Sequence, residues 1–352
     1  MEEQTPGGPE RVRAAVIGCG GWGTALAILL ARSGHEAVIW GVEPHYVRQM
    51  ADTRLNPRYL PGVEMPTSVG LSAEMAECVP GADVVVVATP TLYLRSVCER
   101  LARHLREGQL VVNVAKGIEE ETLLLGSQVV EDVCGAGLRL AGLYGPSHAE
   151  EVARRLPTTV VATGRDGAAA RQTQGVFMCP TFRVYTNTDV TGVELGAALK
   201  NVIAIAAGMC DGLGFGDNAK SALLTRGLAE IARLGVAMGA RAETFAGLTG
   251  LGDLITTCIS PYGRNRAVGM RIAKGERLEQ ILAGMDQVAE GVRTTRSACA
   301  LAERHEVEMP ICRGVYAVLF EGKDPLEAGR ELMERAPRPE HDRARGAAGG
   351  CT

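Results

Sequence analysis

The stretch RAAVIGCGGWGTALAILLARSGHEAVIW, residues 13–40, decides how the chain begins to fold. Its first five residues, Arg13–Ile17, are typical of a short buried strand. A glycine-rich turn follows, and residues 24–33 have the apolar spacing of a helix. After Gly34, the segment Glu36–Trp40 has the pattern of a second strand. A G-x-G-x-x-G turn in this strand–helix–strand setting indicates a dinucleotide-binding unit, against the alternative of a glycine-rich turn with no ligand.

The glycines of this turn have separate expected roles. Gly18 permits the tight turn, Gly20 lets the backbone approach a pyrophosphate, and Gly23 allows the helix to pack on its strand. The first turn of the helix offers its free N–H groups to the phosphates.

Two valine-rich segments, residues 83–89 and 109–115, predict strands that are buried on both faces of a parallel sheet. Ligands bind at the carboxyl ends of such strands, so Thr89 and Lys116 become candidates. A lysine in an ordinary polar loop is the alternative for Lys116. After a further strand at Arg139–Tyr144, Ser147 and the glutamate three residues later have the spacing of a capping box.

Composition excludes several classes of function. The chain has 352 residues, a net charge of −4 and scattered basic residues, so we expect no nucleic-acid partner. Its ten cysteines show no C-x-x-C spacing, which argues against a metal site or a disulfide framework and favours a cytoplasmic location. The N-terminus lacks the apolar core of a signal peptide. No uncharged apolar run reaches the ~18 residues of a membrane span, so we expect no integral membrane association.

The length predicts about two domains. We expect a dinucleotide-binding α/β domain at residues 11–187 and a helical substrate domain at residues 188–335. The tails, residues 1–10 and 336–352, are expected to be disordered. Helices are predicted at residues 191–209, 219–238, 243–248 and 265–274.

The helical half contains a lysine in unusual surroundings. In LGAALKNVIAIAAGM, residues 195–209, Lys200 shares its helix face with alanines and a glycine rather than with other charges. The alternative is a lysine at the helix rim whose ammonium group reaches water. Further on, GLTGLGDL places Asp253 in a turn expected to be flexible, and Arg264-Asn265 at a loop-to-helix junction is suited to a phosphate. An ordinary surface patch is the alternative for the Arg-Asn pair.

Eight motifs now occur in a familiar order, namely GCGGWGTALA, NPRYLPG, VAKGIEEET, GPSHAEEV, LKNVIAIAAGM, GLTGLGDL, GRNR and AEGVRTT. With these motifs the chain resembles the NAD(P)-dependent glycerol-3-phosphate dehydrogenases of the bacterial type, and the resemblance runs from about residue 13 to residue 334. The resemblance implies a Rossmann-like domain followed by an all-α domain. It also implies reduction of dihydroxyacetone phosphate to sn-glycerol 3-phosphate for glycerophospholipid synthesis, and it is compatible with a homodimer.

The resemblance also implies site residues. Lys200 would give or take the proton at the substrate carbonyl, and Lys116 and Asp253 would complete the catalytic group. We expect repulsion from Lys116 to lower the pKa of Lys200 toward neutrality. The implied substrate-binding residues are Lys116, Gly145, Ser147, Asn201, Asp253, Thr257, Gly263, Arg264 and Asn265. The implied cofactor-binding residues are Gly18, Gly20, Gly21, Trp22, Gly23, Tyr59, Lys116, Ala149, Arg264, Val288 and Glu290.

Three positions depart from the family pattern. Gly21 and Gly263 replace serines that are common there, and each loses a hydroxyl contact. Val42 replaces an arginine that many members carry after Trp-Gly and that would bind the 2′-phosphate of NADP. His45 or Arg48 is the alternative cation for that phosphate, and Glu43 is suited instead to the ribose hydroxyls of NAD. The cofactor is therefore expected to be NAD or NADP, with NAD favoured.

Two other functions fit parts of the pattern. A different dehydrogenase of the β-hydroxyacid type would share the first half and a helix-borne lysine, but it would not need Arg264-Asn265 unless its substrate were also phosphorylated. A nucleotide-sensing module would keep the glycines without needing Lys116, Lys200 and Asp253 together.

Overall fold

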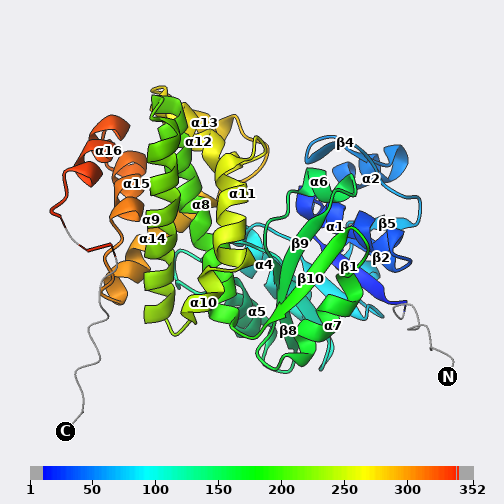
Figure 1. Ribbon diagram of the computed structural model, residues 1–352. Helices are drawn as coiled ribbons and strands as arrows, with labels where there is room; N and C mark the ends of the chain where they lie inside the picture. Colours follow the sequence, from blue (N-terminus) through cyan, green and yellow to red (C-terminus); the bar gives the residue numbers. More distant parts are fainter. Residues whose placement is uncertain (1–10, 338, 341–352) are drawn as a thin grey trace, which may run out of the picture.

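The computed structural model describes residues 11–337, 339 and 340. A sheet region and a helical region lie side by side (Figure 1). The expected terminal tails, residues 1–10 and most of 336–352, lie outside the described residues. Sheet pairing ends at Asn187 and the long helices begin at Val190, next to the predicted domain boundary. The division of the chain into two domains at this boundary remains a prediction.

The sheet region contains one eight-stranded sheet, a two-stranded hairpin and covering helices. The strands of the large sheet are β1 (Arg13–Ile17), β2 (Glu36–Trp40), β5 (Val69–Ser72), β6 (Val84–Val87), β7 (Leu110–Asn113), β8 (Arg139–Tyr144), β9 (Thr158–Thr163) and β10 (Phe182–Asn187). The hairpin is β3 (Leu55–Asn56) with β4 (Leu60–Glu64). The helices are α1 (Gly21–Arg32), α2 (Pro44–Thr53), α3 (Met75–Cys78), α4 (Thr91–Ala102), α5 (Gly126–Cys134), α6 (Ala149–Ala153) and α7 (Ala168–Phe177).

The strand order is β10-β9-β8-β7-β6-β1-β2-β5. The six strands from β5 to β8 are parallel and have the 3-2-1-4-5-6 order of a Rossmann sheet. The order in which the chain adds strands to the sheet reverses between β1 and β6. Strand β9 pairs antiparallel to β8, and β10 pairs parallel to β9. These two strands, which the sequence analysis did not single out, carry the sheet toward the helical region.

The central strands are buried on both faces, as their valine runs predicted. In β6, Val84 and Val86 belong to one hydrophobic core, and Val85 and Val87 belong to the core on the other face. The ends of β1 and β6 are thereby fixed between two packed layers, which gives the loops that follow them a rigid base.

The helical region is built around one long buried helix. Its elements are α8 (Val190–Leu213), α9 (Gly216–Ala237), α10 (Ala242–Phe245), the π-helical turn η1 (Leu248–Gly252), α11 (Asp253–Ile259), α12 (Arg264–Ala273), α13 (Leu278–Ala283), α14 (Glu290–Arg304), α15 (Pro310–Phe320) and α16 (Pro325–Met333). The predicted helices therefore exist with ends shifted by a few residues. The predicted helix at residues 243–248 is short, and a π-helical turn follows it.

Helix α8 is buried along residues 192–209 and packs against α9, α11, α12 and α14. A methyl group at Gly208 would lie 2.0 Å from the carbonyl oxygen of Arg266, so the glycine permits the close crossing of α8 and α12. By length and composition α8 is long enough to cross a membrane, but 94% of its most apolar window is buried inside the protein. It is the core helix of this region, and it carries Lys200.

Candidate active site

The glycine-rich loop lies at the point where the strand order reverses. Gly18 has a φ of 127°, and a methyl group there would lie 2.5 Å from the carbonyl oxygen of Ala88, at the end of β6. A methyl group at Gly23 would lie 2.1 Å from the carbonyl oxygen of Gly18. Gly20, in contrast, has nothing within 4 Å of that position. The loop is therefore packed behind and open in front, which is the arrangement that a pyrophosphate requires.

Buried polar atoms without hydrogen-bond partners face this part of the fold. They are Nε1 of Trp22 in α1, Oγ1 of Thr89 after β6, and Oγ1 of Thr91 at the start of α4. A buried polar atom without a partner is costly unless a ligand or a water satisfies it. Together with the open backbone at Gly20, these atoms fit a bound dinucleotide.

The outer cofactor candidates come from both regions. Glu290, the first residue of α14, accepts a hydrogen bond from the backbone N–H of Thr91 at 2.9 Å. The guanidinium of Arg264 donates to the carbonyl oxygen of Val288 at 3.0 Å. The carbonyl oxygen of Tyr59, beside the β3–β4 hairpin, accepts from Gln287 at 3.2 Å. These contacts connect the mouth of the dinucleotide site to the helical region.

Lys200 is deeply buried, and its ammonium group makes two side-chain hydrogen bonds. Its side chain is 5% exposed, which rules out a lysine at the helix rim. The ammonium group donates to Oδ1 of Asp253 at 2.6 Å and to Oγ1 of Thr257 at 2.6 Å. Both partners lie on α11. The small residues around Lys200 thus let α11 approach α8 closely.

Lys116 reaches the same carboxylate from the sheet region. Its ammonium group donates to Oδ2 of Asp253 at 3.1 Å and to the carbonyl oxygen of Gly145 at 2.9 Å. The expectation that Asp253 lies in a flexible turn is wrong. Asp253 is the buried first residue of α11, because the π-helical turn before it continues into the helix.

Burial sets the charge of Lys200. It lowers the pKa of the ammonium group to about 7, the neighbouring Asp253 acts in the opposite direction, and Lys116 lowers it further. The expected repulsion from Lys116 is therefore present. Desolvation is the larger effect, because α8 is enclosed on every side.

Two asparagines continue the site toward α14. Nδ2 of Asn201 donates to the carbonyl oxygen of Lys116 at 3.2 Å, and its Oδ1 accepts from Asn265 at 2.9 Å. Oδ1 of Asn265 in turn accepts the N–H of Gly291 at 2.9 Å. This chain of bonds fixes the start of α12, where the exposed guanidinium of Arg264 is available to a ligand.

The loop after β8 differs from its prediction. Ser147 does not cap a helix with a capping box. Its hydroxyl donates to the carbonyl oxygen of Gly145 at 2.9 Å, and α6 begins only after His148. Ser147 and Lys116 therefore donate to the same carbonyl oxygen, and Ser147 lies at the edge of the lysine site.

Sequence reasoning missed a buried network behind these groups. Glu194 of α8 accepts from the hydroxyl of Tyr144 at 2.7 Å and from the hydroxyl of Ser127 at 2.8 Å. Asn113, at the end of β7, donates to the same tyrosine oxygen at 2.8 Å. The network fixes α8 to the strand ends that precede Lys116 and Gly145. Its signal in the sequence was Glu194 itself, a carboxylate among apolar residues one position before the stretch 195–209.

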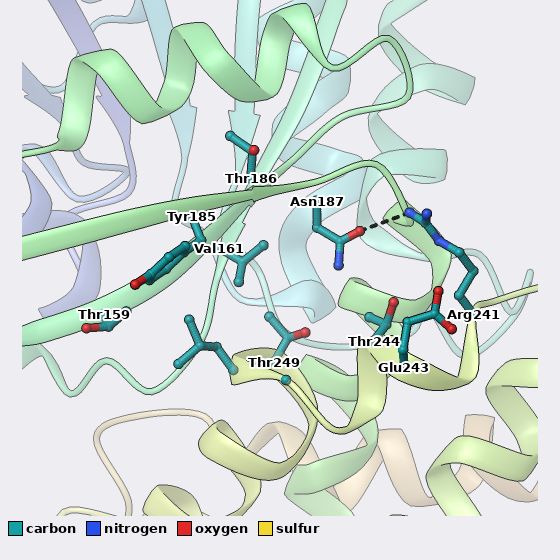
Figure 2. A pocket seen from close by; sticks show the side chains of 11 residues that line it. Thr159, Val161, Tyr185, Thr186, Asn187, Arg241, Glu243, Thr244 and Thr249 are labelled. Atoms are coloured by element: carbon teal, nitrogen blue, oxygen red, sulfur yellow. Dashed lines mark hydrogen bonds between the residues drawn. The ribbon is translucent and has the colours of Figure 1, made fainter.

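A separate cavity of about 600 Å³ opens between the sheet edge and the helical region (Figure 2). Tyr185 and Asn187 of β10 line one side, and Arg241, Thr244 and Thr249 line the other. The side chain of Arg241 donates to Asn187 across it. Neither lysine lines this cavity, so it is not the candidate site.

Comparison with known proteins agrees with this geometry. Residues 13–170 match the family model for the N-terminus of NAD-dependent glycerol-3-phosphate dehydrogenase. Residues 189–330 match the model for its C-terminus. The chain belongs to the NAD-dependent glycerol-3-phosphate dehydrogenase family.

Similar members of this family cover nearly the whole chain. A Salinibacter ruber protein named glycerol-3-phosphate dehydrogenase [NAD(P)+] 2 is 50% identical over 93% of this chain and 95% of its own length. A Pelotomaculum thermopropionicum protein named glycerol-3-phosphate dehydrogenase [NAD(P)+] is also 50% identical, over 92% and 93%. The crystal structure of glycerol-3-phosphate dehydrogenase from Coxiella burnetii superposes with a TM-score of 0.89 at 35% identity, covering 92% of this chain and 99% of that one. The Rossmann-like and helical fold class is confirmed.

The two glycines that depart from the family's serines have steric reasons. A methyl group at Gly21 would lie 2.5 Å from the carbonyl oxygen of Tyr59. One at Gly263 would lie 2.8 Å from the carbonyl oxygen of Thr257. In this family member the neighbouring backbone occupies the space of each side chain, so more is changed than the loss of a hydroxyl group.

Proposed function

We propose that this chain catalyses the NAD(P)-dependent, reversible reduction of dihydroxyacetone phosphate to sn-glycerol 3-phosphate. The main support is the pair of ammonium groups, Lys116 and Lys200, that share the buried carboxylate of Asp253. The family membership and the names of the relatives support the same activity. When bound, the nicotinamide cofactor supplies or accepts the hydride.

Lys200 would act as the general acid in reduction. The ketone oxygen becomes more basic as its carbon is reduced, and a positioned acid must then supply a proton. With a pKa of about 7, Lys200 is able to give a proton as the ammonium ion at neutral pH and to take one back as the neutral amine in the reverse direction. Asp253 and Thr257 would orient it, and Lys116 would stabilise negative charge on the oxygen.

Arg264 and Asn265 would bind the phosphate at the start of α12. The free N–H groups of a helix N-terminus and a guanidinium group together favour a dianion. Asn265 is itself oriented by Asn201 and Gly291. Binding at this end of the substrate would orient the reacting carbon toward Lys200.

The cellular role proposed here is supply of sn-glycerol 3-phosphate for glycerophospholipid synthesis in the cytoplasm. The nine cysteines in the described residues are free thiols, which supports a reducing compartment. A homodimer is the proposed assembly.

The deciding experiment is oxidation of NADH and of NADPH by the purified protein with two ketones. Dihydroxyacetone phosphate should support turnover, and unphosphorylated dihydroxyacetone should not at the same concentration. Equal rates with both ketones would favour a different dehydrogenase of the β-hydroxyacid type. Dinucleotide binding without turnover would favour a nucleotide-sensing module.

A further inference from the structure

One buried ring nitrogen near the site has no hydrogen-bond partner and no role so far. His148 lies between Ser147 and α6, and its Nε2 is buried without a hydrogen-bond partner. Its ring packs against Tyr262, with ring centroids 5.7 Å apart. Tyr262 lies two residues before Arg264, the proposed phosphate-binding residue. The histidine ring therefore contacts the segment that leads to Arg264.

The ring is neutral at physiological pH. Its pKa is lowered to about 4, mainly by burial and then by the ammonium groups of Lys200 and Lys116, while Asp253 and a hydrogen bond to the backbone of Thr256 act in the opposite direction. The preceding residue, Ser147, donates to the carbonyl oxygen of Gly145 that also accepts from Lys116, so the ring follows directly on the lysine site in the chain. A neutral imidazole carries one N–H donor and one acceptor nitrogen. A hydroxyl group can satisfy either, because it both donates and accepts.

The other polar side chains around the lysines already have partners. The ammonium groups of Lys200 and Lys116 bind Asp253, and Ser147 donates to the carbonyl oxygen of Gly145. The amides of Asn201 and Asn265 are bonded to one another and to backbone. The exception in this group of described residues is Nε2 of His148.

We infer that His148 binds the C1 hydroxyl of the three-carbon substrate and so determines specificity for a hydroxymethyl ketone. The inference rests on the proposed function, in which Lys200 and Lys116 take the C2 oxygen and Arg264 takes the phosphate. The hydroxyl is then the polar group of dihydroxyacetone phosphate that has no assigned partner. Nε2 of His148 is a buried atom in the residue next to Ser147 that lacks one.

The test compares dihydroxyacetone phosphate with hydroxyacetone phosphate, which has a methyl group in place of the hydroxymethyl group. The wild-type protein should prefer the hydroxylated ketone by at least about tenfold in kcat/KM, because a site built for a hydroxyl rejects an analogue that lacks it. His148→Phe keeps the ring against Tyr262 but removes the nitrogen. Its preference should fall to about twofold, with the loss confined to dihydroxyacetone phosphate.

His148→Gln supplies an amide near the position of Nε2 and should retain an intermediate preference. Activity of both variants on hydroxyacetone phosphate shows that they fold. An equal loss on both ketones, an unchanged preference, or a raised KM for NADH would overturn the inference. The first indicates a packing role and the last a contact with the cofactor. A wild-type protein inactive with both ketones would overturn the proposed function itself.

Discussion

Lys116 and Lys200 come from the two regions of the chain and donate to opposite oxygens of one carboxylate, that of Asp253, at 3.1 Å and 2.6 Å. The carboxylate side chain is 2% exposed. Two ammonium groups repel each other in a buried setting unless an anion lies between them. Asp253 therefore holds together a site whose halves belong to separate parts of the fold.

Replacing Lys200 by alanine should reduce turnover by at least about 100-fold, the usual contribution of a positioned acid. Binding of NADH, followed by fluorescence titration, should stay close to wild type, because the contacts of Lys200 are to α11 and not to the glycine loop. Lys220→Ala, which removes a lysine paired with Asp211 elsewhere, is the matched control. More than about a tenth of wild-type turnover in Lys200→Ala would contradict the proton-transfer role.

The two directions of the reaction should depend on pH in opposite ways. Reduction needs Lys200 protonated, so its kcat should be constant below about pH 7 and fall above it, since the pKa is lowered to about 7. Oxidation of glycerol 3-phosphate needs the neutral amine, so its kcat should rise up to the same pH and then level off. Steady-state rates with saturating substrates between pH 5.5 and 9.5, a range chosen to bracket that pKa by roughly two units, test both. Parallel profiles in the two directions would exclude Lys200 as the titrating group.

Arg264→Ala should raise the KM for dihydroxyacetone phosphate by roughly 10- to 100-fold, the effect of losing a hydrogen bond to a charged group of about 1.5–3 kcal/mol. Arg266→Ala removes a guanidinium two residues away that binds Asp211 at 2.6 Å, and it should leave this KM nearly unchanged. If instead the two variants behaved alike, the phosphate would lie outside the start of α12, most plausibly near Ser147.

Glu194→Ala should destabilise the fold by about 2–4 kcal/mol, because the buried partners Tyr144 and Ser127 would lose their acceptor. The midpoint of urea unfolding measures this. Glu99→Ala, on the exposed side of α4, is the matched control and should change stability by less than about 0.5 kcal/mol. A Glu194→Ala midpoint equal to that of the control would show that the network does not stabilise α8 against the sheet.

How much could be predicted from the sequence depends on distance along the chain. The strand–turn–helix at residues 13–40 is local, because glycine positions and apolar spacing determine it, and its two strands have the predicted bounds. Lys116 and Asp253 are in contact although 137 residues separate them in sequence. The resemblance implied that both belong to the site, but it did not predict their hydrogen bond. The capping box at Ser147 is wrong for a local reason, because the carbonyl oxygen of Gly145, two residues earlier, competes for the hydroxyl. Glu194 escaped notice because burial of a carboxylate depends on partners from three other elements.

Cofactor choice depends on the charges near the end of β2. Val42 is 60% exposed and offers no charge, as the sequence analysis noted. The structure places a further cation, Arg58, near Glu43, and the sequence analysis did not indicate it. Arg58, beside the hairpin, donates to Glu43 at 3.2 Å and lies 3.8 Å from a carboxylate oxygen of Asp286. Two carboxylates therefore flank this arginine, and its charge is offset before any 2′-phosphate arrives.

We predict that NADH is used at least as well as NADPH. The 2′-phosphate of NADPH would bring nearly two negative charges toward Glu43, where the charge of Arg58 is already offset, a penalty of about 1–3 kcal/mol or tenfold and more in kcat/KM. Val42→Arg should then improve kcat/KM for NADPH by about tenfold and leave that for NADH nearly unchanged, measured at one salt concentration because the effect is screened. Glu43→Gln should act in the same direction but less, since it frees Arg58 without adding a charge. A wild-type preference of tenfold for NADPH, lost in Arg58→Ala, would show instead that Arg58 exchanges its carboxylates for the phosphate, and Val42→Arg would then change little.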